Sequence, residues 1–145
     1  MVLNITAKSI LNRSKRNGYS IASSNYHKNV IAAAEYGLNP EVHIYRYPGK
    51  EQIARFKADT TMKLQDMIFS RDGRYLLMIG GIPDFRISIY DLETNQKLKI
   101  KPEVKLPCKA ADYKKTKFNP SNDREFAIMS TNAMYFFSIV EGFEG

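Results

Sequence analysis

Residues Phe85–Leu98 read FRISIYDLETNQKL, and this stretch decides the fold. Ile87 and Ile89 alternate with polar residues, which is the period-two pattern of a strand with one buried and one exposed face. Thr94-Asn95 suits a turn, and a second short alternating run follows it. The stretch therefore predicts a β-hairpin.

The same pattern recurs along the chain at a spacing of about 45 residues. Aromatic-ended strands carry Ile44-Tyr45, Ile89-Tyr90 and Phe136-Phe137, which are 45 and then 47 residues apart. A continuous apolar run precedes each of these strands, a turn signal precedes each run, and a short strand precedes each turn. The predicted strands are Gly18–Ser23, Val30–Ala34, Glu41–Tyr47 and Gln52–Lys57, then Leu64–Phe69, Tyr75–Ile79, Arg86–Leu92 and Gln96–Ile100, then Thr116–Phe118, Phe126–Met129 and Ala133–Val140.

Four strands per unit at this period are typical of a β-propeller blade. A β-sandwich also uses short antiparallel strands, but it gives no reason for the repetition. We therefore predict an all-β fold, an incomplete β-propeller of about three blades with four antiparallel strands each. The expected divisions are the outer half of a preceding blade (1–17), two whole blades (18–60 and 61–105) and a blade that lacks its last strand (106–145).

Such an arc has too few blades to close. Propellers typically form rings of about four to eight blades, because each blade's faces must be covered by its neighbours. An open arc exposes an apolar sheet face at each end, and such a surface usually marks an interface. We therefore expect the sequence to be part of a longer chain, or else to lie against a partner.

The basic N-terminus, which has no acidic residue before Glu35, also allows a second interpretation as a mitochondrial targeting peptide.

Several stretches taken together resemble one family. The stretch Ala34–Gly49 reads AEYGLNPEVHIYRYPG, Phe69–Leu77 reads FSRDGRYLL, Ile82–Arg86 reads IPDFR and Phe118–Pro120 reads FNP. In order and spacing they resemble the WD-repeat region near the start of cilia- and flagella-associated proteins 43 and 44. The resemblance covers about residues 18–140 and implies a WD40-type propeller. The chain departs from ordinary WD repeats in lacking the Gly-His and Trp-Asp pairs, and Tyr90-Asp91 is its nearest equivalent of Trp-Asp.

The resemblance implies a non-catalytic, structural segment of an axonemal protein in a cilium or flagellum. In that family the role is in the tether that holds inner-arm dynein to doublet microtubules. The implied partners are a paralogous WD-repeat tether subunit, the inner-arm dynein heavy chain and tubulin. The residues quoted above do not separate the two family members.

The residues themselves point away from catalysis, metals and cofactors. His27 and His43 have no Cys, Asp or His companion at ligand spacing, which predicts structural or surface histidines. Cys108 lies near lysines that favour its thiolate, but no histidine partner is evident, so we expect a packed thiol. Gly80-Gly81 lacks the lysine of a phosphate-binding loop and is interpreted as a turn. We expect no enzyme activity, no metal and no cofactor.

The net charge of +7 is concentrated in one run: eight lysines lie between Lys97 and Lys117, against only Glu103 and Asp112. Such lysines can keep an edge strand soluble, or they can bind an acidic partner such as a tubulin surface in a salt-sensitive contact. The alternative function is a cytosolic WD-repeat binding module that contacts RNA or a ribosome through this run. Nucleic acid is disfavoured because only one aromatic, Tyr113, is interleaved with the lysines. No apolar run is long enough to cross a bilayer, so we expect no membrane partner. The candidate contact residues are Lys109, Lys114, Lys115 and Lys117.

Overall fold

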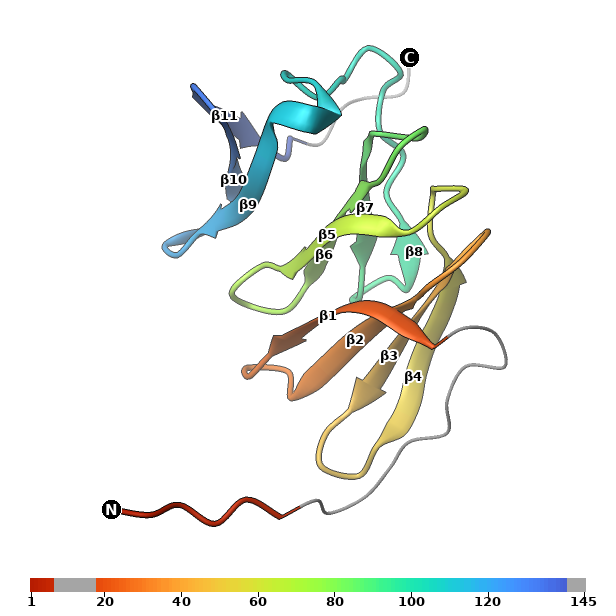
Figure 1. The fold of residues 1–145 in the computed structure, drawn as a ribbon, viewed down its shortest axis with the longest axis vertical. Helices are drawn as coiled ribbons and strands as arrows, with labels where there is room; N and C mark the ends of the chain where they lie inside the picture. Colours follow the sequence, from red (N-terminus) through yellow and green to blue (C-terminus); the bar gives the residue numbers. More distant parts are fainter. Residues whose placement is uncertain (7–17, 141–145) are drawn as a thin grey trace.

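The computed structural model describes residues 1–6 and 18–140 and confirms the all-β fold (Figure 1). Three antiparallel sheets follow one another along the chain. Apart from one short 3-10 turn, all the regular secondary structure of the described residues is β-strand. The first sheet holds β1 (Tyr19–Asn25), β2 (Val30–Glu35), β3 (Glu41–Arg46) and β4 (Glu51–Lys57). The second holds β5 (Leu64–Phe69), β6 (Tyr75–Gly80), β7 (Ile87–Asp91) and β8 (Gln96–Lys97). The third holds β9 (Tyr113–Asn119), β10 (Asn122–Ser130) and β11 (Met134–Ser138), after a 3-10 turn at Ala110–Asp112. Among the described residues, no helix has the length and apolar character needed to cross a bilayer.

The sheets are arranged as the blades of a propeller. Within each sheet the strands pair in chain order, so the first strand of each unit lies at one edge. These first strands lie next to one another, because β5 contacts β1 on one side and β9 on the other. The sheets fan outward from this line of inner strands (Figure 1). The arrangement explains why the middle strand of the second blade, β6, is buried at every position.

Hydrogen bonds between the tight turns that follow the inner strands hold neighbouring blades together. Asn25, at the end of β1, donates from Nδ2 to the carbonyl oxygens of Ser70 and Arg71, at 2.9 and 2.8 Å. Gly73 sits in the same turn with φ +77°, and a Cβ there would lie 2.6 Å from the Asn25 Oδ1. The turn therefore needs glycine both for its left-handed backbone and for the close approach of the first blade. One blade further on, the Arg71 side chain donates to the carbonyl oxygen of Pro120 at 2.9 Å.

Each sheet has one face toward the following sheet, here called its forward face, and one toward the preceding sheet, its backward face. The forward face of the first sheet packs against Leu76, Met78 and Tyr90 on the backward face of the second. The forward face of the second sheet packs in the same way against Phe126, Ile128 and Phe137 of the third. The two core clusters therefore lie between blades rather than within them. The forward faces are Ala32, Ala34, Val42 and Ile44 in the first sheet, and Leu77, Ile79, Ile87 and Ile89 in the second.

The structure corrects the predicted end of one strand, and it does not test the half-blade predicted at residues 1–17. The fourth strand of the second sheet was expected to reach Ile100, but β8 ends at Lys97. Leu98 and Ile100 instead pack against the second core cluster, because the chain there crosses toward the third sheet. Residues 1–6 form no strand and are exposed, and residues 7–17 lie outside the described residues. The outer half-blade expected at 1–17 therefore stays a prediction.

The aspartate of the Tyr90-Asp91 pair anchors the corner after β7. Its carboxylate is buried and accepts from Arg74 Nε at 3.3 Å, from Arg74 Nη2 at 3.2 Å and from the backbone N–H of Glu93 at 2.9 Å. Burial by itself raises the pKa of Asp91, but the hydrogen bonds from Arg74 and Glu93 outweigh it, so this pKa lies below its ordinary value. At the position of the aspartate in an ordinary Trp-Asp pair, Asp91 is thus buried and pairs with the partly exposed Arg74.

We expect Asp91→Asn to lower the free energy of unfolding by about 1–3 kcal/mol at pH 7, the cost of losing charged hydrogen bonds at a buried site. Because folding lowers the pKa of Asp91, its contribution is complete above the unfolded-state value of about 3.9 and is lost as the pH falls through the folded-state pKa. Urea unfolding of both proteins between pH 7 and pH 3 measures this, and their difference is expected to shrink toward the acid end. Glu93→Gln is the matched control, since that carboxylate contacts the same Arg74 but is 69% exposed. A difference that is independent of pH would contradict the assignment.

Candidate interaction surface

The forward face of the third sheet is apolar and is not covered by any described part of the chain. Phe136 on β11 pairs in register with Ala127 on β10, and Ala127 pairs with Lys117 on β9. Met129 and Met134 form the next cross-strand pair on the same face. Phe136 is 77% exposed and Met134 is 55% exposed, whereas the opposite face of the sheet is packed into the second core cluster.

The same position is buried in the two preceding blades. Ile44 pairs with Ala32, Ile89 pairs with Leu77, and Phe136 pairs with Ala127, each on the forward face of its own sheet. Ile44 is 0% exposed and Ile89 is 5% exposed, because the following sheet covers each of them. Phe136 therefore occupies a position that becomes core wherever a further sheet is present.

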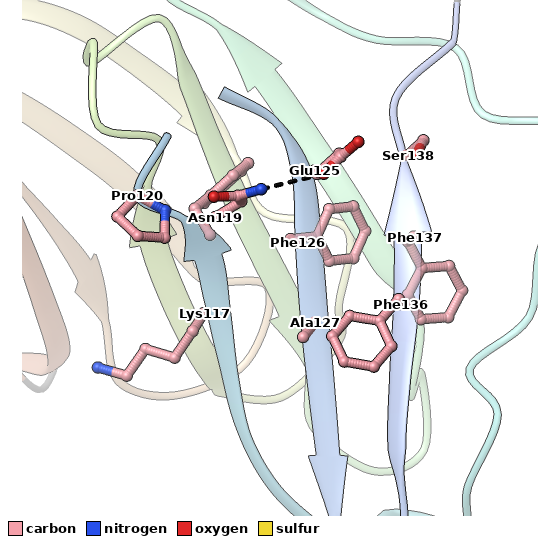
Figure 2. Close-up of a pocket in the computed structure, with 10 residues that line it drawn as sticks. Lys117, Asn119, Pro120, Glu125, Phe126, Ala127, Phe136, Phe137 and Ser138 are labelled. Atoms are coloured by element: carbon pink, nitrogen blue, oxygen red, sulfur yellow. Dashed lines mark hydrogen bonds between the residues drawn. The ribbon is translucent and has the colours of Figure 1, made fainter. Parts of the chain in front are cut away.

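A concavity of about 440 Å³ lies beside β9, β10 and β11, and residues of both faces of the third sheet line it (Figure 2). Ala127 and Phe136 line it from the forward face, whereas Phe126 and Phe137 belong to the backward face. Asn119 donates from Nδ2 to Glu125 Oε2 at 3.0 Å near one end. The concavity suits the insertion of large apolar side chains from a partner, with polar groups at its rim. Its lining residues are Lys117, Phe118, Asn119, Pro120, Glu125, Phe126, Ala127, Phe136, Phe137 and Ser138.

The structure places three of the four candidate lysines on a single strand. Lys114, Lys115 and Lys117 are exposed on β9, an edge strand of its sheet, and Lys109 directly precedes the 3-10 turn. Lys117 lines the concavity. Lys115 is not simply available to a partner, because its Nζ lies 3.4 Å from the buried carboxylate of Asp66. The basic run is therefore in part a structural feature of the interface between the second and third blades.

The thiol of Cys108 differs from expectation. Nearby lysines were expected to favour its thiolate, but burial, followed by the charge of Asp112, raises the pKa of Cys108 above its ordinary value. The thiol is partly buried and packs against the second core cluster, which the expectation of a packed thiol anticipated. Desolvation, the larger of the two causes, opposes the charged form of the thiol.

The two histidines lie in different surroundings. His27 is exposed in the turn after β1, with its ring centroid 4.0 Å from that of Tyr26. His43 is buried beside Glu35 and Glu41 on the backward face of the first sheet. The sequence analysis missed this cluster because it considered only Cys, Asp and His as companions of the histidines, whereas the companions of His43 are glutamates. The available signal was Glu41-Val-His43, which places a carboxylate and an imidazole on the same face of one strand.

Comparisons with known proteins agree with this architecture. Residues 16–142 match the family described as the CFAP43 N-terminal domain. The chain is 24% identical over 119 residues to cilia- and flagella-associated protein 43 of Mus musculus, with 82% of this chain and 7% of that protein covered. It is 28% identical over 120 residues to cilia- and flagella-associated protein 44 of the same species, with 81% and 6% covered. The chain therefore spans only a small part of the length of these relatives.

A solved structure is similar over most of the chain. The β-propeller domain of Cps50 (Swd1) from Myceliophteria thermophila superposes with a TM-score of 0.63 at 15% sequence identity. The similarity covers 90% of this chain and 37% of the solved one. At this identity the likeness concerns the fold alone, and it identifies the three sheets as blades of a WD40-type propeller.

Proposed function

This chain belongs to the CFAP43 N-terminal domain family, and from that premise we propose that it is a non-catalytic structural segment of an axonemal protein. Its curated relatives are named as cilia- and flagella-associated proteins, which supports a ciliary or flagellar protein with a WD-like fold. The finer proposal is that it contributes to the tether that holds inner-arm dynein to doublet microtubules. Its proposed partners are a paralogous WD-repeat tether subunit, the inner-arm dynein heavy chain and tubulin.

The proposed mechanism is rigid display by packed blades. The observation that carries it is the exposure of Phe136 at a position where Ile44 and Ile89 are buried by the next sheet. We infer that the occupant of this face is the following blade of a closed ring. Such a blade presents aliphatic and aromatic side chains, as β10 and β11 present Phe126, Ile128 and Phe137 to the second sheet. The share of the solved propeller that this chain covers, 37%, agrees with an arc that needs further blades.

The basic run is the proposed contact for an acidic partner such as a tubulin surface. Lys109, Lys114 and Lys117 are exposed, and they lie on or directly before one strand. Exposed charges of one sign attract an acidic surface over about a Debye length, roughly 8–10 Å at physiological salt, so this contact is expected to weaken as salt is added. Lys115 is left out of the proposed contact because of its ion pair with Asp66.

Phe136→Glu tests the proposed surface in a ciliated cell. We expect the tagged full-length protein to lie along the axoneme and to remain there after detergent extraction. We expect Phe136→Glu to lose most of this retained signal, because a charge at this position opposes burial under another blade. Fluorescence microscopy with and without detergent measures both. Tyr36→Glu is the matched control, since Tyr36 is a 50% exposed aromatic in a loop outside this face.

The outcomes separate the two parts of the proposal. A diffuse cytosolic signal from the unchanged protein would contradict the axonemal role. Equal retention of the Phe136→Glu and unchanged proteins would contradict the covered face while leaving the axonemal role standing.

A further inference from the structure

Three potential metal ligands converge on the backward face of the first sheet. Glu35 is the last residue of β2, and Glu41 and His43 lie on one face of β3. One ligand atom from each residue can be chosen so that all lie within 4.8 Å of one another. Glu35 is 5% exposed and His43 is 7% exposed, so two of the three side chains are withdrawn from water.

The buried His43 ring directs an unsatisfied nitrogen into this cluster. Nδ1 lies 3.5 Å from Oε1 of Gln52, at the outer limit of a hydrogen bond. Because that oxygen can only accept, the contact is favourable with the ring proton on Nδ1. Nε2 then carries a lone pair, has no hydrogen-bond partner, and lies 3.6 Å from Glu35 Oε2. The rings of Tyr19 and Tyr45 pack around the imidazole, at centroid distances of 6.1 and 6.3 Å. A buried lone pair that faces a carboxylate is unfavourable unless a proton or a metal ion lies between them.

The distance between the two atoms fits a metal ion better than a direct hydrogen bond. An N–H···O bond has a length of about 2.7–3.2 Å, so 3.6 Å is too long for one. Two ligands on a tetrahedral zinc ion, each bound at about 2.0–2.1 Å, are separated by about 3.3–3.4 Å. A small adjustment therefore brings Nε2 and Oε2 into the first shell of one ion. The Gln52 oxygen on Nδ1 is then the outer partner that metal-binding histidines normally have.

The two carboxylates are already oriented by neighbouring groups. The backbone N–H of Glu41 donates to Glu35 Oε1 at 2.9 Å, which turns Oε2 toward the imidazole. The other carboxylate is steadied by Arg55, whose Nε donates to Glu41 Oε2. The guanidinium neutralises part of the charge of that pair of carboxylates and keeps them together without an ion. The ligands are thus held in place before any metal arrives, which lowers the ordering cost of binding.

From this geometry we propose that Glu35, Glu41 and His43 form a zinc-binding site. Imidazole nitrogen with carboxylate oxygen suits Zn²⁺, whereas Mg²⁺ and Ca²⁺ prefer oxygen alone. Three protein ligands leave a fourth position for water or for a group from whatever covers this face. The ion would join the ends of β2 and β3 on the side of the first blade opposite the second. This inference revises the expectation, drawn from residue spacing, that neither histidine is a ligand.

The test uses the 145-residue chain with Cys108→Ser, which removes the only thiol as a competing ligand. Zinc is titrated into the protein against a chromophoric chelator, and we expect a single ion bound per chain. His43→Gln is expected to lower the affinity by more than about 100-fold, and Gln52→Leu by about 10–100-fold, the usual effect of losing an outer partner. His27→Gln, which removes the other histidine, is expected to leave the affinity unchanged. A large excess of Mg²⁺ is expected not to displace the zinc.

Several results would overturn the site. They are the absence of zinc binding, an affinity unchanged by His43→Gln, or an affinity lost on His27→Gln. Circular dichroism checks that each variant is folded. Should His43→Gln not fold, Glu41→Gln takes its place, since Glu41 is only partly buried. Its affinity is expected to fall at least about tenfold, and an unchanged value would exclude Glu41 as a ligand.

Discussion

Ile89→Glu is expected to lower the free energy of unfolding by about 4 kcal/mol or more, whereas Phe136→Glu is expected to change it by less than about 1 kcal/mol. The two residues occupy the same register position in successive blades. Ile89 is 5% exposed in the core between the second and third sheets, so a carboxylate there loses its hydration without gaining a partner. Phe136 is 77% exposed, so a carboxylate at that position stays in water. Urea unfolding of the isolated chain, followed by circular dichroism, measures both changes.

The pair is a controlled comparison because the substitution is the same and the strand position is the same. Ile44→Glu, in the first blade, is expected to behave like Ile89→Glu, since Ile44 is fully buried by the second sheet. Comparable destabilisation by Ile89→Glu and Phe136→Glu would show that the third sheet's forward face is already covered in the isolated chain. That result would contradict the description of this face as an open end.

Asp66→Ala is expected to lower the free energy of unfolding by about 3–5 kcal/mol, because it breaks a buried polar network between two blades. The Asp66 carboxylate is buried on β5 and accepts from the hydroxyl of Tyr113 at 2.7 Å and from the backbone N–H of Thr116 at 3.2 Å. It also accepts from the N–H of Met67 at 2.9 Å and pairs with Lys115 at 3.4 Å. Burial, together with the neighbouring carboxylate, raises the pKa of Tyr113 far above its ordinary range, so its hydroxyl remains a donor. Alanine leaves the N–H of Thr116 buried without this acceptor.

Denaturant unfolding measures the total effect of Asp66→Ala, and amide hydrogen exchange locates it. We expect the largest loss of protection in β9 and β10, because Asp66 on the second sheet accepts hydrogen bonds from Tyr113 and Thr116 on β9 of the third. Asp59→Ala is the control: its carboxylate is 44% exposed and pairs with Lys97 at the surface, so a change of about 0–1 kcal/mol is expected. Similar destabilisation by both changes, or uniform loss of protection in all three sheets, would contradict a specific link between blades.

Local patterns in the sequence predict the strands well, and the reason is geometric. Alternation in Arg86–Leu92 and the apolar run at Tyr75–Ile79 each reflect how many faces of the strand are covered, and both became strands close to the expected bounds. The prediction that the fourth strand of the second sheet reaches Ile100 was wrong, because Leu98 and Ile100 alternate like strand residues but pack into the core between the second and third sheets. The raised pKa of Cys108 could not be inferred from the nearby lysines, because sequence neighbours say nothing of desolvation. The cluster of Glu35, Glu41 and His43 was missed because its members come together only through the pairing of β2 with β3.

The sequence by itself determined the blade, its repetition and the family resemblance, because each depends on the period-two order of side chains within short stretches. It could not determine which of the repeated faces are buried. Ile89 in FRISIYDLETNQKL and Phe136 in its later copy obey the same pattern, yet one is core and the other is surface. Only the tertiary structure decided this, because burial depends on whether a second sheet lies against the first. The same packing brought Asp66 to Tyr113 across 47 residues and His43 to Glu35, and so created the inter-blade link and the proposed zinc site.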